Sequence, residues 1–300
     1  MRKAGVVFCY LQSIPRQTVL FIMAEAEMAI QKIAVSFKKK EIGNTFTHLQ
    51  TKGAYTLTEH FQQKNISVPE GIWIMRQTWN DVLFAHWPVD VSILRALVPS
   101  VLELDTYNGQ AWISMLPFML TNLRARYLPA IPGARAFPEL NLRTYVTYKG
   151  KPGIYFFSLD ADHRLAVLGA RTFFHLPYFY ANMKAEKNGD AIDYVSKRKD
   201  DKEAAFHAAY RPISAPFTAE KDSLDYWLTE RYRLYTTNQN KLYYEDIHHH
   251  PWLLQNAEAE ISVNTVTDAH GITLPESDPD PLLHYAKKQD VLFWPLRKRS

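Results

Sequence analysis

The clearest alternation of polar and hydrophobic residues along the chain lies between Pro138 and Tyr148. Successive side chains of a β-strand point to opposite faces, so this period of two predicts a strand. The two faces carry different residues, namely Leu142, Thr144 and Val146 on one and Glu139, Asn141, Arg143 and Tyr145 on the other. A polar and charged row of this kind must meet either water or a polar interior.

Two further strands are predicted immediately after this one. The LysGlyLysProGly run at 149–153 has the glycine and proline chemistry of a hairpin turn. Residues 154–159 (IYFFSL) are almost wholly apolar, which predicts a strand covered on both faces. Residues 165–171 (LAVLGAR) repeat the apolar pattern with a charge at the end and predict a third strand. Pro177 then marks the passage from strand to loop or helix.

Strand patterns also dominate the rest of the chain from Met75 onwards. Residues 75–89 predict an entering strand, and Asp90 can cap a short helix over 91–98. Ser223 can cap a second helix that begins at Leu224, and residues 233–247 predict a hairpin. We therefore expect an α+β fold that is mostly β.

Composition narrows the class of protein. The chain has 300 residues, 47% hydrophobic and 22% charged, which is enough for a sizeable core. Its net charge of +4 is small and its basic residues are scattered, so we expect no nucleic-acid partner. The single cysteine, Cys9, excludes an internal disulfide framework and a cysteine-based zinc site, and it fits a cytoplasmic protein.

The first 74 residues form a separate, poorly assigned extension. Their apolar runs at 4–11 and 19–23 are too short to cross a bilayer, so no membrane partner is expected. Two interpretations of residues 1–74 stay open: a disordered or helical appendage, or an artefact of an upstream start site. The regular domain is predicted over residues 75–300.

Several segments in this domain carry a family resemblance. The segments HWPVD, PELNLRTYV, KGKPGIYFFSLDA, LAVLGAR, HLPY, LTERYRLYT, DIHHHPW and LQNAEAEI follow one another in order. Together they resemble the uncharacterised bacterial DUF2071 family over about residues 75–297. That family is similar in fold to acetoacetate decarboxylase, which implies a closed, cone-like β-barrel with a few helices packed outside.

The resemblance does not extend to the chemistry of acetoacetate decarboxylase. That enzyme forms a Schiff base through one of two lysines that directly follow a proline. In this chain Tyr178 and Phe179 follow Pro177. A phenol and a benzene ring cannot form an imine, so the resemblance implies no Schiff-base route, and no cofactor is expected.

The resemblance does carry over some polar residues of the site. Glu139 falls where the decarboxylase has an active-site glutamate, and Arg171 falls near its arginine. A closed barrel with a polar interior would bring both close to the row on the first strand. The predicted catalytic residues are Glu139, His175 and Tyr178, and the predicted ligand-binding residues are Asn141, Arg143 and Arg171. An alternative stays open in which Glu139 and Arg143 form a purely structural ion pair.

No other motif indicates a known chemistry. His248, His249 and His250 are adjacent, and consecutive residues of an extended chain point in alternating directions, so we predict a packed loop and no metal site. His86 is interpreted as a satisfied core histidine. The sequence lacks the GxGxxG, P-loop and GxSxG signatures.

The sequence therefore predicts a small organic acid or carbonyl compound as the ligand of the barrel. Any reaction would use general acid–base catalysis without a covalent intermediate, as in a lyase, isomerase or hydratase. The alternative function is a non-catalytic binding or assembly protein with a structural polar core. Decarboxylases of this fold tend to assemble, so a homo-oligomer is compatible with both.

Overall fold

A computed structural model describes residues 68–127, 135–199, 204–274 and 280–299. The chain divides into two compact units, residues 1–62 and 63–300, and every described residue belongs to the second. The expectations for the N-terminal extension fall, up to residue 67, outside the described residues. Within the second unit, the chain enters its first strand at Met75, where the regular hydrophobic pattern begins.

Thirteen strands and a few short helices make up the described part of the chain. The strands are β1 (Met75–Val89), β2 (Glu103–Leu104), β3 (Ala111–Ala125), β4 (Ala136–Tyr148), β5 (Lys151–Ala161), β6 (Tyr178–Asn188), β7 (Ala191–Arg198), β8 (Ala205–Pro212), β9 (Arg233–Asn238), β10 (Lys241–His248), β11 (Gln255–Asn264), β12 (Leu282–Phe293) and β13 (Arg297–Lys298). The α-helices are α4 (Val91–Leu97), α5 (Arg164–Phe173) and α6 (Leu224–Thr229), and a 3₁₀ helix covers Asp268–His270.

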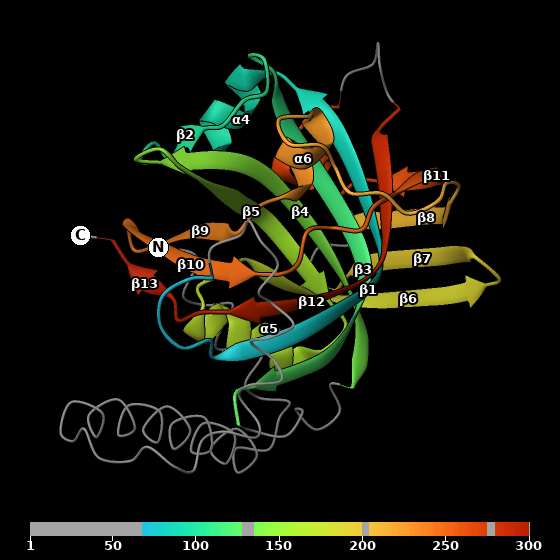
Figure 1. Cartoon of the computed structure of the whole chain (residues 1–300), viewed down its shortest axis with the longest axis horizontal. Coiled ribbons are helices and arrows are strands. Elements are labelled where there is room, and N and C mark those ends of the chain that lie inside the picture. Colours follow the sequence, from blue (N-terminus) through green and yellow to red (C-terminus); the bar gives the residue numbers. More distant parts are fainter. Residues whose placement is uncertain (1–67, 128–134, 200–203, 275–279, 300) are drawn as a thin grey trace. The chain divides into compact units, whose positions relative to one another are not determined.

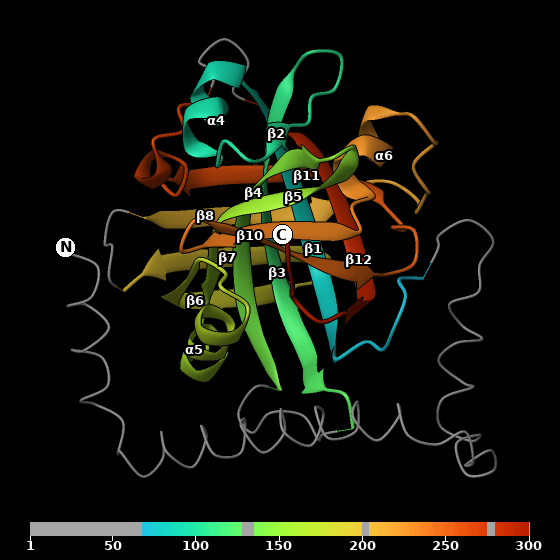
Figure 2. The ribbon, with the colours of Figure 1, turned by 90° about the vertical axis from the view of Figure 1, so that its left-hand side faces the viewer.

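The sheet closes on itself in two ways (Figures 1 and 2). A smaller closed circuit, which we call the seven-strand ring, passes through β12, β1, β3, β4, β5, β9 and β10. A larger one, the nine-strand ring, shares the first five of these strands and returns through β6, β7, β8 and β11. This mostly β, closed-barrel architecture confirms the expected fold class.

The five shared strands are buried on both faces. One face lies inside the seven-strand ring and the opposite face lies inside the nine-strand ring. One face packs into a core inside the seven-strand ring that contains Phe84, Phe118 and Leu159. The other face packs into a second core, with Leu83, Leu142 and Tyr194, inside the nine-strand ring. This explains why β5 is apolar on both sides, as its sequence predicts.

Two helices begin at the caps that the sequence predicts. The Asp90 side chain accepts a hydrogen bond from the Ser92 amide at 2.7 Å, and α4 starts one residue later. The Ser223 hydroxyl accepts from the Tyr226 amide at 3.2 Å at the start of α6. Figures 1 and 2 place α4 and α6 at one end of the strands and α5 at the opposite end.

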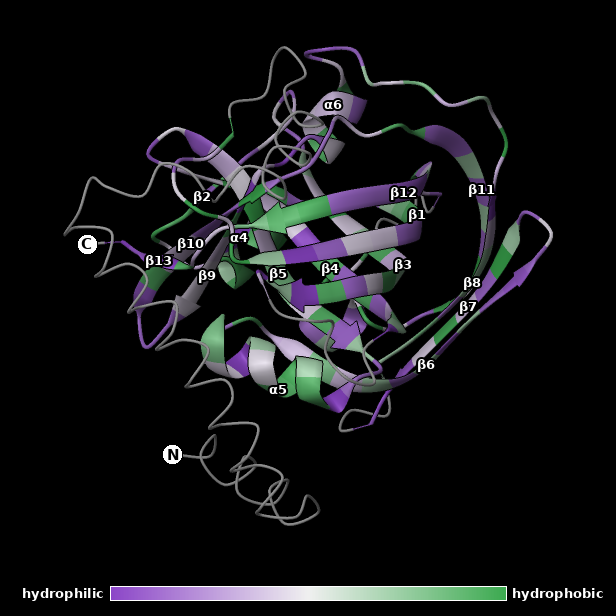
Figure 3. Cartoon of the chain, turned by 60° about the horizontal axis from the view of Figure 1, so that its bottom comes forward, coloured by the Kyte–Doolittle hydropathy of each residue, from purple (hydrophilic) through white to green (hydrophobic). Residues whose placement is uncertain are grey.

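The prediction of a third strand at 165–171 is wrong, because these residues lie in α5. Val167 is buried against the core of the seven-strand ring, whereas Arg164, Leu168 and Thr172, which follow one another at intervals of four residues, are exposed. This separation of faces is helical, and Figure 3 shows hydrophobic and hydrophilic bands alternating along α5. The cap is the side chain of His163, which accepts from the Ala166 amide at 3.1 Å and is not a standard capping signal.

Candidate functional site

Strand register aligns a group of polar residues on the inner face of the seven-strand ring. His86 on β1 pairs with Ser114 on β3, and Ser114 pairs with Arg143 on β4. Directly opposed residues of antiparallel strands share a face. One row across three strands therefore carries His86, Ser114 and Arg143. On the same face, His284 pairs with Phe84, Leu116 pairs with Asn141, and Phe118 pairs with Glu139.

The polar row predicted on β4 faces a polar interior. Glu139, Asn141 and Arg143 are 3%, 3% and 4% exposed, and Tyr145 is completely buried. The interpretation of Glu139 and Arg143 as an ion pair is wrong, because no salt bridge joins them among the described residues. The carboxyl group has a different partner.

Glu139 lies against Tyr178, which enters the ring from β6. The Tyr178 hydroxyl donates to Glu139 Oε1 at 3.1 Å, and Asn141 also hydrogen-bonds to the carboxyl group. Burial dominates over these hydrogen bonds and raises the pKa of Glu139 to about 8. Burial and the neighbouring Glu139 raise the pKa of Tyr178 well above its ordinary value. Near pH 7 the Glu139 carboxyl is therefore mostly protonated and neutral.

Arg143 is a buried cation without a carboxylate partner in the described part of the chain. Its Nη2 donates to the Leu228 carbonyl at 3.3 Å, and its guanidinium lies 5.9 Å from the Phe84 ring centre. Burial lowers the pKa of Arg143, but arginine keeps its charge in proteins.

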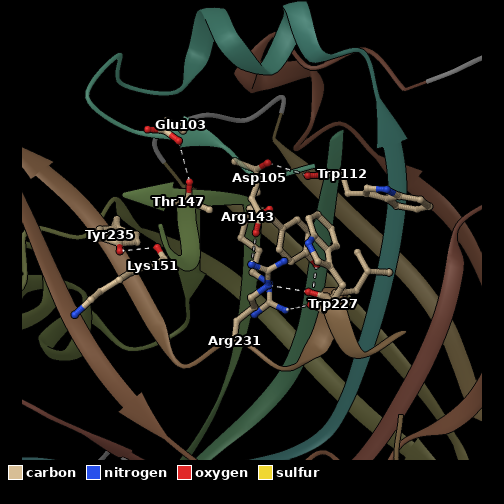
Figure 4. A network of polar contacts seen from close by, with 12 residues as sticks. Glu103, Asp105, Trp112, Arg143, Thr147, Lys151, Trp227, Arg231 and Tyr235 are labelled. Atoms are coloured by element: carbon tan, nitrogen blue, oxygen red, sulfur yellow. Dashed lines mark hydrogen bonds and ion pairs between the residues drawn. The ribbon is translucent and has the colours of Figure 1, made fainter. Parts of the chain in front are cut away.

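The neighbouring Arg231, unlike Arg143, has a carboxylate that balances its charge. It lies on the same Tyr145 ring as Arg143, and its Nη1 contacts Asp105 Oδ2 at 2.5 Å. Figure 4 shows Arg143, Arg231 and Trp227 gathered at this end of the ring. The carboxylate of Asp105 neutralises Arg231, whereas Arg143 retains an unbalanced positive charge.

Several buried polar atoms inside the ring lack a hydrogen-bond partner. They are His86 Nε2, Asn141 Oδ1, Arg143 Nε, Glu245 Oε1, Trp252 Nε1 and His284 Nδ1. Glu245 pairs with Leu234, a residue of the same core, and therefore faces inwards. Burial raises the pKa of Glu245 well above its ordinary value. Buried polar atoms are normally satisfied, so a concentration of unsatisfied ones marks a place where a polar ligand or water would bind.

Arg171 and His175 lie apart from this group, in an open pocket of about 310 Å³. The pocket occupies a fork in the sheet, where β5 pairs with β9 at Ile154–Tyr155 and with β6 at Leu159–Ala161. Arg171 Nε donates to the Tyr178 carbonyl at 2.5 Å, so the β6 backbone stands between the pocket and the interior. The expectation that Arg171 joins the β4 row is wrong because α5 is a helix outside the ring.

The lysines of the described ranges are all exposed. A Schiff-base lysine requires a desolvated amine, and no such amine lies in the described interior. Tyr178, which directly follows Pro177, is 8% exposed. The Tyr178 hydroxyl donates a hydrogen bond to the Glu139 carboxyl group.

The loop at 248–252 is packed, as predicted. His249 is 2% exposed and lies between Tyr232 and Trp252, with ring centres at 4.6 and 5.2 Å. Trp252 enters the core of the seven-strand ring and contacts Phe84 edge to face at 4.8 Å. No group of three metal-ligating side chains occurs within the described ranges.

Sequence reasoning missed part of the interior. Ser114, Glu245 and His284 were not predicted, and His86 was interpreted as satisfied although its Nε2 has no partner. A single signal was available in the sequence. His284 lies on β12 two residues before Ala286, and residues two apart in a strand share a face.

The fold is similar to that of acetoacetate decarboxylase. The enduracididine biosynthesis enzyme MppR, complexed with pyruvate, aligns with a TM-score of 0.53 at 12% identity, over 80% of this chain and 93% of that one. Acetoacetate decarboxylase from Legionella pneumophila aligns with a TM-score of 0.52 at 14% identity, over 85% and 98%. At these identities the likeness concerns the fold alone.

The chain belongs to the DUF2071 family, described as an uncharacterized conserved protein, whose model matches residues 76–290. It is 95% identical over 244 residues to the uncharacterized protein YqjF of Bacillus subtilis (strain 168), which covers 81% of this chain and all of that protein. Across the ranges that the structure describes, we find no helix with the length and apolar character needed to cross a bilayer.

Proposed function

We propose that this protein binds a small organic acid inside the seven-strand ring, with the carboxylate on Arg143. The observation that carries the proposal is the unbalanced charge of that side chain. Arg143 is 4% exposed, forms no salt bridge with a described residue, and has an unpartnered Nε. An isolated buried charge is costly, and an anionic ligand would remove the cost. The guanidinium fork also matches carboxylate geometry.

The neutral state of the surrounding acids supports an anionic ligand. Burial raises the pKa of Glu139 to about 8 and the pKa of Glu245 well above its ordinary value, and neither carboxyl group forms a salt bridge with Arg143. Burial lowers the pKa of His249 to about 4, so this ring adds no positive charge. Arg143 is therefore a buried charge without a salt bridge to a described residue, and a carboxylate would neutralise it.

Glu139 and Tyr178 are suited to hold the other end of the acid. A carboxyl group with a pKa of about 8 can donate or accept a proton near neutral pH, as a general acid or base must. The structurally similar MppR is complexed with pyruvate, a keto acid, so keto acids are tested as ligands together with other small acids. Any reaction would run without an imine. Cytoplasmic location and self-association stay predictions of the sequence.

A thermal-shift screen with small keto, hydroxy and simple carboxylic acids tests the proposal. A ligand at a hundredfold excess over its Kd should raise the Tm by about 5–10 °C. Arg143→Met should abolish the shift while the protein stays folded. Arg171→Met is the matched control, because this arginine lies in the open pocket, and it should leave the shift intact.

Two outcomes contradict the proposal. Loss of the shift in Arg171→Met with retention in Arg143→Met would move the site to the open pocket. A complete absence of shifts, together with a lower Tm of Arg143→Met, would support the structural polar core instead.

A further inference from the structure

The directions of the hydrogen bonds around His86 follow from the Leu228 carbonyl, because a carbonyl oxygen can only accept a hydrogen bond. The Tyr145 hydroxyl donates to the Leu228 carbonyl at 3.0 Å, which uses its single hydrogen. Tyr145 must then accept from the Ser114 hydroxyl, with which it forms a very short contact. Because the Ser114 hydrogen is used as well, the Ser114 oxygen accepts from His86 Nδ1 at 2.6 Å. His86 Nδ1 therefore carries a hydrogen.

The opposite nitrogen of His86 is a hydrogen-bond acceptor. Burial, followed by the nearby His284 and Arg143, lowers the pKa of His86 well below its ordinary value, so the ring is neutral. A neutral imidazole has one N–H, and here it is on Nδ1. Nε2 then presents a lone pair, and it is buried without a partner.

His284 presents a second acceptor beside it. Its Nε2 lies 3.2 Å from Asp225 Oδ1, and this hydrogen bond lowers the pKa of Asp225, so the ionised carboxylate accepts. With a single hydrogen on the ring, held on Nε2 by this contact, Nδ1 carries a lone pair, and Nδ1 is also buried without a partner. The two ring centres lie 5.7 Å apart, and the two free nitrogens do not bond to each other.

The His86 acceptor lies within the reach of a small acid held by Arg143. His86 and Arg143 occupy one cross-strand row separated by Ser114, which places their Cα atoms about 10 Å apart. Their side chains approach the same Phe84 ring, each at 5.9 Å. Two hydrogen bonds of about 2.8 Å and a short carbon skeleton fill such a span.

We propose that the acid bound in this ring carries a hydrogen-donating substituent, a hydroxyl or an amine, that points to His86 Nε2 and His284 Nδ1. This inference rests on the proposed function, because Arg143 supplies the carboxylate end. A keto group has no hydrogen and would leave both acceptors unsatisfied. The site is therefore expected to select hydroxy or amino acids over the keto acids of equal length.

The tautomers can be tested without a ligand. ¹⁵N NMR of the full chain at pH 8, with the histidines assigned by substitution, should show His86 protonated on Nδ1 and His284 on Nε2. Free histidine at this pH is a mixture of tautomers, so two opposite, fixed tautomers are a specific expectation. A hydrogen on His86 Nε2 overturns the inference.

Ligand selection is tested by calorimetry at pH 8 with pyruvate, lactate and alanine and their four- and five-carbon counterparts. A hydroxy or amino acid should bind about tenfold or more tightly than the keto acid of the same skeleton. His86→Asn keeps a donor near Ser114 and lacks Nε2, so it should lose this preference while keeping its affinity for the keto acid. His284→Gln, which keeps a donor toward Asp225 and lacks Nδ1, provides the same test should His86→Asn fail to fold.

The outcomes separate the two proposals. If all three classes bind equally and Arg143→Met abolishes binding, the acid site stands and the donor preference is refuted, which would assign the two acceptors to water. If no acid binds the native protein, both proposals fall. If the preference exists and disappears only in the histidine variants, both stand.

Discussion

Replacing Glu139 by glutamine should change how the stability of this protein depends on pH. Glu139 is 3% exposed, and burial raises its pKa from 4.5 to about 8. In the unfolded chain the group ionises near its ordinary pKa. Between these two values the folded state holds a proton that the unfolded state has lost. Stability therefore falls as pH rises through this window, is highest below the unfolded pKa, and levels off above the folded one.

The size of the effect follows from the two pKa values. Each pH unit inside the window costs about 1.4 kcal/mol, so the native chain should lose about 3.5 kcal/mol between pH 5 and pH 8 because of this carboxyl. Glutamine does not titrate and lacks this loss. The difference in unfolding free energy between Glu139→Gln and the native chain should therefore move by about 3.5 kcal/mol in favour of the variant over that range.

Urea unfolding followed by circular dichroism at pH 5, 6, 7, 8 and 9 measures this difference. Glu245 also has a raised pKa and contributes a loss of the same sign, but it is present in both proteins and cancels in the comparison. Tyr178→Phe adds an independent check. It removes a hydrogen bond that lowers the pKa of Glu139, so the falling limb should extend to higher pH. A difference that stays constant from pH 5 to pH 9 would refute the reasoning, because it would mean that Glu139 ionises normally.

Two contrasts between matched variants follow from the packing. Arg143→Met leaves no buried carboxylate unpaired, so it should be neutral or stabilising without ligand. Arg198→Met removes the 2.8 Å salt bridge to Asp160 and should lower the free energy of unfolding in urea by about 3–5 kcal/mol. Equal losses would contradict this assignment. Gly153→Ala should lower the Tm because the added Cβ would lie 2.8 Å from a backbone carbonyl, at a cost of about 1–3 kcal/mol. Gly169→Ala, which meets nothing within 4 Å in α5, should raise the Tm, and a loss there would refute the packing argument.

Local signals in the sequence were sufficient for many elements of the fold. The period-two pattern identified β4, and the caps at Asp90 and Ser223 located α4 and α6. These signals depend on residues next to one another in the chain. Where the local signal was unusual, the prediction was wrong: the histidine cap of α5 gave no helix signal, and its short apolar run matched a strand equally well.

The candidate site was only partly predictable for the same reason. Glu139, Asn141, Arg143 and Tyr178 were predicted and do lie inside one ring, whereas Arg171 and His175 lie in the open pocket. The separation depends on α5 and on the fork between β6 and β9, neither of which leaves a pattern in a single segment. Strand register brings His284 and Glu245 to the interior from more than a hundred residues away.

The sequence by itself determined that this chain forms strands with a polar inner row and that it carries no lysine after Pro177. It did not determine which charges are balanced. Only the closed sheet pairs Arg231 with Asp105 and leaves Arg143 alone, because the distance between side chains on different strands depends on register and ring closure. Burial and pairing together decide the charge state of each group, and both are properties of the tertiary structure.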